Sequence, residues 1–353
     1  MPHPDLISYP LPRLLYIQKH YGAGCSVMMP KDFLIRELTG NSVTDIYSMR
    51  GIANLQTCQY AAGILSELDI PIHLPELKRP EDLAGYITQA AAEQYGLPVG
   101  MPVYTGCNDF YAGLLGMGIC RTGDAFDLTG TSEHIGYISE NLQSSGFVSG
   151  GYFAGFCTYG GTKASGSSCQ LAIDNFGIDG LSTGDILPQK PPVFLPYLSG
   201  ERAPIFDENA RGVYFGLHAE TDKNMLSYAT LEGVVFSLYH IAQSMQMPSP
   251  KRLICGGGGA RSDFLNSLKA TIFGCPVVAT QESDTSALGA CILAMAACGC
   301  YEDLEAAVKA SVTYQPEISP DMTLREQLLC RYSIYKELYP ALKSTFALFG
   351  SMQ

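Results

Sequence analysis

The stretch from Arg252 to Thr280, RLICGGGGARSDFLNSLKATIFGCPVVAT, decides the class of fold. Its first run, Arg252 to Cys255, predicts a strand, and four glycines then lead into a helix from Asp263 to Phe273. A second short strand, Pro276 to Ala279, precedes a helix from Thr285 to Cys298. This order of strand, glycine turn, helix, strand and helix predicts a parallel sheet in an α/β fold.

The pattern of apolar and polar residues changes near Gly118. Before it, the pattern is mainly helical, with helices expected at 11–20, 30–39, 60–68, 86–95 and 110–117 and one strand at 101–105. The helix at 30–39 is expected to bury an apolar face that includes Phe33, Leu34 and Leu38. After it, alternating runs at 124–129 and 134–138 and a Gly- and Tyr-rich stretch at 146–161 predict antiparallel strands, followed by helices at 168–176 and 225–245. We therefore predict two domains, 1–118 and 119–353.

Composition limits the function. The chain has 353 residues, 46% of them hydrophobic and 16% charged, which is enough for a substantial core in two domains. The formal net charge of -12, with Lys and Arg scattered, argues against a nucleic acid or an anionic membrane as partner. An anionic nucleotide is still allowed, because backbone N–H groups and helix N-termini supply local positive potential.

The cysteines and histidines indicate neither a metal site nor a disulfide scaffold. None of the 12 cysteines forms a C-x-x-C pair, and without a signal peptide they predict reduced thiols in a cytosolic protein. The six histidines form no metal-binding cluster. The longest apolar run, Ala287 to Cys300, is too short to cross a bilayer and predicts a buried helix.

Asp109 is the first candidate catalytic residue. It follows the strand at 101–105 and begins the helix at 110–117, which is where open α/β sheets place ligand contacts. Asp109 is therefore a candidate general base. The alternative is an N-cap, since an aspartate just before an apolar helix satisfies free N–H groups.

Two glycine-containing turns are candidates for binding phosphate or nucleotide. Thr129-Gly130-Thr131-Ser132 joins two expected strands and suits either an anion or an ordinary hairpin turn. Gly256 to Ser262 follows a strand and opens a helix, so it suits either a nucleotide or a closely packed turn. It matches neither the dinucleotide fingerprint nor the P-loop. The charged loop from Gly200 to Gly212 alone indicates a solvated connection, with the possibility of an internal ion pair.

Taken in order, these segments resemble the FGGY carbohydrate kinases. The resemblance rests on 106–109, 130–132, 166–170, 200–217, 231–234, 256–262 and 287–290, and it covers almost the whole chain from Tyr9 onward. The stretch 200–217, which begins Gly-Glu-Arg-Ala-Pro, is the most specific part.

The resemblance implies an actin- and hexokinase-like fold of two ribonuclease-H-like domains. The first, sugar-binding domain would be truncated, and the second would bind the nucleotide. It also implies transfer of the γ-phosphoryl group of ATP, with Mg²⁺, to a sugar or polyol hydroxyl. Asp109 then matches the catalytic base. Matches to nucleotide contacts follow along the chain: Gly130, Thr131, Gly166, Gln170, Gly258, Gly259 and Ser262.

One family segment has no counterpart in the sequence. The family's D-x-G-T phosphate loop, whose aspartate helps to hold Mg²⁺, would precede Met1. Uncovered sheet edges and apolar helix faces then predict poor solubility or a homo-oligomer. Three explanations stay open: a start codon placed too late or a gene fragment, a split kinase with a separate N-terminal chain, and a catalytically incomplete nucleotide-binding remnant. The segments at 130–132 and 200–204 look closest to xylulose kinases, which favours a ketose such as a pentulose as substrate.

Overall fold

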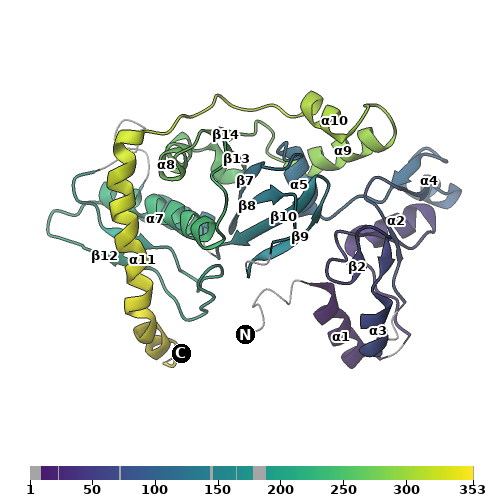
Figure 1. Ribbon diagram of the computed structural model, residues 1–353, viewed down its shortest axis with the longest axis horizontal. Coiled ribbons are helices and arrows are strands. Elements are labelled where there is room, and N and C mark those ends of the chain that lie inside the picture. The colour runs from purple at the N-terminus through teal and green to yellow at the C-terminus, as the bar shows by residue number, and fades with distance from the viewer. Residues whose placement is uncertain are drawn as a thin grey trace. The chain divides into compact units, whose positions relative to one another are not determined.

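The computed structural model describes residues 9–22, 24–70, 73–143, 146–163, 165–177 and 188–352 (Figure 1). They form two compact units. The first takes the described residues of Met1–Cys120, Gly150–Phe156 and Asp284–Val312, and the second those of Arg121–Ser149, Cys157–Ser283 and Thr313–Gln353. The expected boundary at 118–119 lies close to the first crossing between units, but 150–156 and 284–312 return to the first unit. The roles expected of the two domains stay predictions.

The first unit consists of helices with short two-stranded sheets. Its helices are α1 (Pro10–Tyr21), α2 (Pro30–Thr39), α3 (Ala62–Glu67), α4 (Gln89–Tyr95), α5 (Asp109–Gly116), α9 (Thr285–Ala297) and α10 (Leu304–Ser311). Its strands pair as β1 (Val43–Asp45) with β4 (Glu76–Lys78), β2 (Ala53–Asn54) with β3 (Gln59–Tyr60), and β5 (Leu83–Tyr86) with β6 (Pro102–Tyr104). The expected helices at 60–68 and 86–95 begin later, because Tyr60 and Tyr86 end strands.

Helix α2 has the expected ends but not the expected buried face. Pro30 is its first residue, and Gly40 ends it in the left-handed conformation at φ 79°, which costs a glycine least. The buried residues are Asp32, Ile35 and Thr39. Phe33 and Leu34, which the sequence placed on the apolar face, are instead 52% and 60% exposed. The apolar pattern was a poor guide because a buried aspartate takes part in the packing of this helix.

Helices α5 and α9 approach each other unusually closely through glycines. A Cβ at Gly116 would lie 1.9 Å from the Thr285 carbonyl oxygen, and one at Gly289 would lie 1.7 Å from that of Ala112. The two backbones can therefore touch only because both positions lack a side chain. Helix α9 was expected to be buried. The structure buries Thr285, Gly289, Ile292 and Leu293 and leaves much of the rest of the helix accessible to solvent.

The second unit is built on a six-stranded sheet in the order β14-β13-β7-β8-β10-β9, of which most of β9 and the start of β10 fall in the segment 150–156 of the first unit. Strand β13 pairs in parallel with β14, and β7 pairs antiparallel with β8, as the sequence predicted. Strand β13 also pairs in parallel with β7, which joins the two predicted groups of strands into one sheet. The strands are β7 (Ala125–Thr129), β8 (Glu133–Ser139), β9 (Val148–Tyr152), β10 (Gly155–Gly161), β13 (Leu253–Gly257) and β14 (Val277–Ala279). Strands β11 (Val193–Leu195) and β12 (Val213–Phe215) form a separate antiparallel pair.

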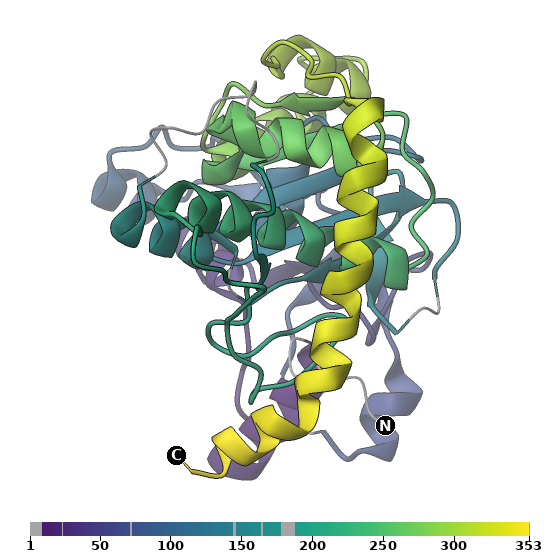
Figure 2. The same cartoon turned by 90° about the vertical axis from the view of Figure 1, so that its left-hand side faces the viewer.

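The helices of the second unit are α6 (Ser165–Asn175), α7 (Lys223–Ser244), α8 (Asp263–Phe273) and α11 (Met322–Gly350), and a 3₁₀ turn, η2 (Gly258–Arg261), precedes α8. Helices α7 and α8 pack against each other and against the sheet, and α11 crosses both (Figures 1 and 2). Their apolar faces meet in a core that includes Tyr228, Phe236 and Tyr335. No helix in the described part of the chain is both long and apolar enough to cross a membrane.

Candidate active site

The turn between β6 and α5 presents Asp109 to solvent. Asn108, not Asp109, caps the helix, because its side chain accepts a hydrogen bond from the Tyr111 N–H at 2.9 Å. The N-cap interpretation of Asp109 is therefore wrong. Asp109 is the first residue of α5, its side chain is exposed, and its Oδ1 accepts from the Phe110 N–H at 2.8 Å. With the capping done by its neighbour, the Asp109 carboxylate is accessible to a ligand.

A lysine that the sequence did not single out supports this turn. Lys31 Nζ lies 2.7 Å from Asp32 Oδ1 and 3.0 Å from Asp45 Oδ2, and both carboxylates are buried. The same ammonium group donates to the Thr105 carbonyl oxygen at 3.4 Å, where β6 gives way to the turn. The sequence could not predict the contact between Lys31 and Thr105, because a lysine followed by an aspartate is common in the first turn of a helix.

Helix α9 holds the other side of the turn within the first unit. Ser286 Oγ donates to the Asp109 carbonyl oxygen at 3.0 Å. This contact depends on the close glycine packing between α5 and α9 described above. Asp109 is thus positioned through its own backbone by one residue of a helix that lies far along the chain.

A pocket in the second unit collects predicted nucleotide contacts. It is open to solvent, has a volume of about 660 Å³, and is lined by Gly130, Thr131, Gly166, Ser167, Gln170, Leu171, Asp174, Asn175 and Leu198. Four of these were predicted from the sequence: Gly130, Thr131, Gly166 and Gln170. The lining combines backbone groups, hydroxyls and amides with few charges, which suits an anionic ligand bound through hydrogen bonds.

The two segments that form this pocket pack backbone to backbone. Gly130 and Thr131 lie in the hairpin turn between β7 and β8, where the Gly130 N–H donates to the Ser132 carbonyl oxygen at 2.8 Å. The hairpin interpretation is therefore confirmed, and the same turn also lines the pocket. A Cβ at Gly166, in the first turn of α6, would lie 2.4 Å from the Gly130 carbonyl oxygen.

The glycine run after β13 lies beside the same end of the sheet. Gly257 pairs with Thr129 in the parallel ladder. Two features require glycine at this position: its φ is +83°, and an added Cβ would lie 2.1 Å from the Thr129 carbonyl oxygen. A Cβ at Gly259 would lie 2.3 Å from Thr129 Cγ2. Close packing therefore explains these two glycines. Gly258 differs, because an added Cβ there would meet nothing within 4 Å.

Gly258, Gly259 and Ser262 are not among the residues that line the pocket. Ser262 caps α8, and its Oγ accepts from the Leu265 N–H at 3.3 Å. Their roles as nucleotide contacts stay predictions. The parallel pairing of β7 and β13 does bring their carboxyl ends, and hence the two turns, to the same edge of the sheet, where such sheets bind ligands.

The loop 200–212 is only in part the solvated connection that its charges suggested, because Arg202 and Glu208 are exposed but Glu201 is buried. Glu201 is 2% exposed. Its Oε1 accepts from the N–H groups of Lys163 and Arg202, each at 2.7 Å, and Ser237 Oγ donates to its Oε2 at 3.5 Å. Burial raises the pKa of Glu201 to about 7, against the opposing effect of these donors. Glu201 thus anchors the segment that leads into α6, and the loop is part of the framework of the pocket.

Comparison with known proteins agrees with this architecture. Two family models match the chain: the N-terminal domain of the FGGY family of carbohydrate kinases over residues 9–116, and the C-terminal domain of that family over 128–298. A xylulose kinase of Lactococcus lactis is 30% identical, and the match covers 95% of this chain and 71% of the relative.

Solved structures give the same result. A ligand-bound xylulose kinase of Lactobacillus acidophilus superposes with a TM-score of 0.85 at 25% identity, covering 97% of this chain and 74% of that one. A gluconate kinase from the same organism has the same TM-score and identity, covering 97% and 73%. The predicted fold class, actin- and hexokinase-like with two domains, is confirmed by these matches.

Proposed function

Because the chain belongs to the FGGY family of carbohydrate kinases, we propose that it transfers the γ-phosphoryl group of ATP to a hydroxyl of a sugar. The proposed substrate class is a ketose such as a pentulose. The proposed base is Asp109. The observation that carries the nucleotide part is the pocket, whose lining includes four residues assigned to the nucleotide from the sequence alone.

The chemistry requires little of the protein beyond positioning. Phosphoryl transfer depends mainly on alignment, charge stabilisation and a base within hydrogen-bond reach of the attacking hydroxyl. An exposed carboxylate at the first turn of α5, held through its backbone by Ser286 and not engaged in capping, meets the requirement for such a base. The missing side chain of Gly166 lets the start of α6 approach the Gly130 carbonyl oxygen closely, which brings the two segments that line the pocket together.

We propose that magnesium enters as the MgATP complex. In the described residues, no three His, Cys, Asp or Glu side chains lie together as metal ligands. Magnesium bound by nucleotide phosphates and water needs no such cluster, since one or two protein carboxylates suffice. The pocket offers one carboxylate, Asp174, which accepts from Gln170 Nε2 at 2.7 Å.

The ketose assignment draws on the names of the relatives. Xylulose kinases stand among both the similar sequences and the similar structures, but a gluconate kinase is equally similar in structure. A sugar acid is therefore the competing substrate class. We also propose a cytosolic location, from the expectation that the cysteines stay reduced. A homo-oligomer, or a separate chain carrying a further kinase segment, remains a prediction from the sequence.

The test is a coupled ADP-release assay with MgATP and a panel of ketopentoses, ketohexoses, polyols and gluconate. We expect turnover on a ketose, and Asp109→Asn should lower kcat by about 10²- to 10⁴-fold, the usual contribution of a general base, without changing ATP affinity. Glu93→Gln, which removes an exposed carboxylate on α4, is the control and should not change kcat.

Two outcomes would contradict the proposal. If the chain binds ATP but phosphorylates no acceptor in the panel, it is not an enzyme by itself, and the alternative of a nucleotide-binding fragment or split-kinase subunit takes over. If turnover occurs and Asp109→Asn retains it, the base is another residue. Turnover on gluconate alone would replace the ketose assignment with a sugar acid.

A further inference from the structure

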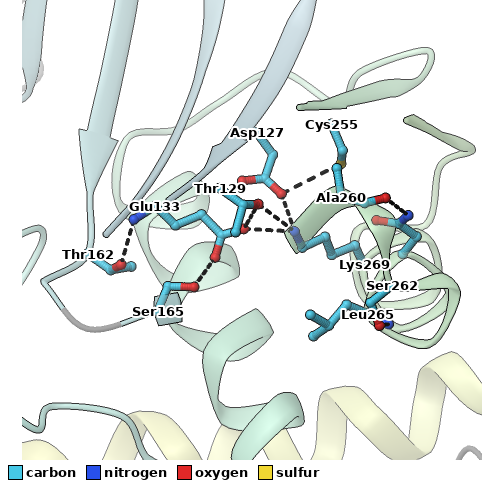
Figure 3. A network of polar contacts seen from close by, with 11 residues as sticks. Asp127, Thr129, Glu133, Thr162, Ser165, Cys255, Ala260, Ser262, Leu265 and Lys269 are labelled. Atoms are coloured by element: carbon cyan, nitrogen blue, oxygen red, sulfur yellow. Dashed lines mark hydrogen bonds and ion pairs between the residues drawn. The ribbon is translucent and has the colours of Figure 1, made fainter. Parts of the chain in front are cut away.

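A buried ion network connects α8 with β7 and β8 (Figure 3). Lys269 on α8 is fully buried and faces two carboxylates, Asp127 on β7 and Glu133 on β8, which are also buried. Its Nζ lies 2.7 Å from Glu133 Oε1 and forms an ion pair with Asp127 Oδ2. A lysine without solvent contact is rare and needs a specific reason.

Glu133 connects this lysine to both segments of the pocket. Its Oε1 accepts a hydrogen bond from Thr129 Oγ1 at 2.6 Å, and its Oε2 accepts one from Ser165 Oγ. Thr129 directly precedes Gly130, and Ser165 directly precedes Gly166. One carboxylate therefore holds the residue before each of the two glycines whose backbones meet in the pocket.

The charges in the network depend on Lys269. Burial raises the pKa of Asp127 to about 8, aided by the charge of Glu133 and opposed by Lys269. Burial also acts to raise the pKa of Glu133, but Lys269 and the hydrogen bonds overcome this and hold it at about 2. Lys269 therefore stabilises the charged form of Glu133, the carboxylate that accepts hydrogen bonds from Thr129 and Ser165. Without the lysine, the Glu133 carboxylate would be an uncompensated buried charge that favours taking up a proton, and protonation would deprive its hydroxyl partners of their strong acceptor.

Stability alone is a poor explanation for this arrangement. Taking an ion pair out of water costs free energy that the attraction between the charges often does not recover, so apolar residues of similar volume can stabilise a protein as well. What an apolar replacement cannot do is accept hydrogen bonds from two separate segments at once.

We propose that Lys269 is a positioning residue: through Glu133 it holds the β7–β8 turn and the start of α6 in the relative placement that the nucleotide requires. The inference rests on the proposed nucleotide function of the pocket. Lys269 itself does not touch the nucleotide. Losing it should weaken nucleotide binding and leave sugar binding unchanged.

Two variants test this link. Lys269→Met keeps the approximate length of the side chain and removes its charge. Ser165→Ala removes the hydrogen bond that Ser165 Oγ on α6 donates to Glu133 Oε2, and it leaves no charge unpaired. The control is Arg331→Met, which breaks another ion pair of this unit, that of the partly buried Arg331 with the buried Glu232 at 2.6 Å. Neither residue of that pair lines the pocket.

Calorimetry measures the binding of a non-hydrolysable ATP analogue with Mg²⁺, and steady-state kinetics measures the KM for sugar. Hydrogen exchange of the backbone amides at 129–133 and 165–170 is measured in the absence of nucleotide. We expect Lys269→Met to raise the analogue Kd by about tenfold and Ser165→Ala by about threefold, the usual coupling within one hydrogen-bond network. Exchange at both segments should rise, and the KM for sugar should stay unchanged. Arg331→Met should lower Tm without changing the analogue Kd.

An unchanged Kd in a folded Lys269→Met protein would overturn the inference, and so would an equal loss of binding in Arg331→Met. If Lys269→Met does not fold, an unchanged Kd in Ser165→Ala decides against it. If the wild-type protein binds no analogue, the proposed function fails. Hydrogen exchange still reports separately on whether Lys269 connects the two segments, and unchanged exchange in both variants rejects that connection.

Discussion

Replacing Gly289 with alanine should disrupt the packing that supports Asp109. The new Cβ would lie 1.7 Å from the Ala112 carbonyl oxygen and 2.6 Å from its carbonyl carbon. A carbon and an oxygen that are not bonded need about 3.3 Å, so the helices would have to separate by about 1.5 Å. Both colliding groups are backbone, and no change of rotamer can relieve the contact.

The expected cost follows from two opposing effects. Overpacking a close contact typically costs about 1–3 kcal/mol and sometimes more, and the absence of any flexible atom places this site at the upper end. Alanine in a helix regains about 1 kcal/mol relative to glycine. We therefore expect Gly289→Ala to lower the free energy of unfolding by about 2–3 kcal/mol, and a shift of about 1 Å at Asp109 to reduce kcat by about 10²-fold.

Gly113→Ala on α5 is the matched control. Its Cβ would meet Ser286 Oγ at 3.2 Å and Thr285 Oγ1 at 3.5 Å, and both are side-chain atoms that can rotate. The gain in helix propensity should then offset any loss, with a net change below about 1 kcal/mol. Urea denaturation followed by circular dichroism measures both variants. If Gly289→Ala is within 1 kcal/mol of the wild type, or no worse than Gly113→Ala, the close packing described here is wrong.

Four further variants test the second unit. Burial, with a smaller contribution from Lys336, lowers the pKa of His240 to about 4. Protonation of the unfolded state therefore costs about 2 kcal/mol of stability as pH falls from 7 to 5, and His240→Gln should remove this loss. The pKa of Glu201, raised to about 7, acts in the opposite direction. The raised pKa of Glu201 costs about 2 kcal/mol of stability as pH rises from 5 to 7, so Glu201→Gln should remove this pH dependence. The free energy of unfolding is measured by urea denaturation at pH 5, 6 and 7. If its dependence on pH is the same in both variants as in the wild type, the assignments are refuted. Gly259→Ala should lower Tm, whereas Gly258→Ala should leave Tm unchanged and weaken binding of MgATP; a normal MgATP Kd in Gly258→Ala would remove Gly258 from the nucleotide site.

Local signals in the sequence located most of the elements. Helix α8 begins and ends at the predicted residues, because Ser262 caps it and Gly274 ends it in the left-handed conformation. The parallel pairing of β13 and β14 followed from the helix between them. These features depend on neighbours within a few residues, which is the range that periodicity and capping describe.

Features that depend on distant partners could not be predicted in this way. The return of 284–312 to the first unit depends on the close contact of α5 and α9 at Gly116 and Gly289, and the sequence around these two glycines shows no pattern that predicts this contact. The burial of Glu201 depends on the Lys163 N–H, a donor that any residue at that position would provide. Four predicted nucleotide residues do line one pocket, but the buried carboxylates that hold the pocket in shape have no sequence pattern of their own.

Both candidate sites are supported by a lysine that pairs with two buried carboxylates, Lys31 below the Asp109 turn and Lys269 beside the pocket. In the group around Lys269 one carboxylate oxygen, Asp127 Oδ1, receives no hydrogen bond from the described residues. An arrangement selected for stability alone would not leave such an oxygen unsatisfied, because it costs free energy. Both groups lie where a strand ends and a functional turn begins, so that ladder hydrogen bonds no longer fix the backbone. A buried lysine that pairs with carboxylates on separate segments makes the turn more rigid. Because burying these charges costs stability, we expect such a lysine only where the geometry of the turn matters for function.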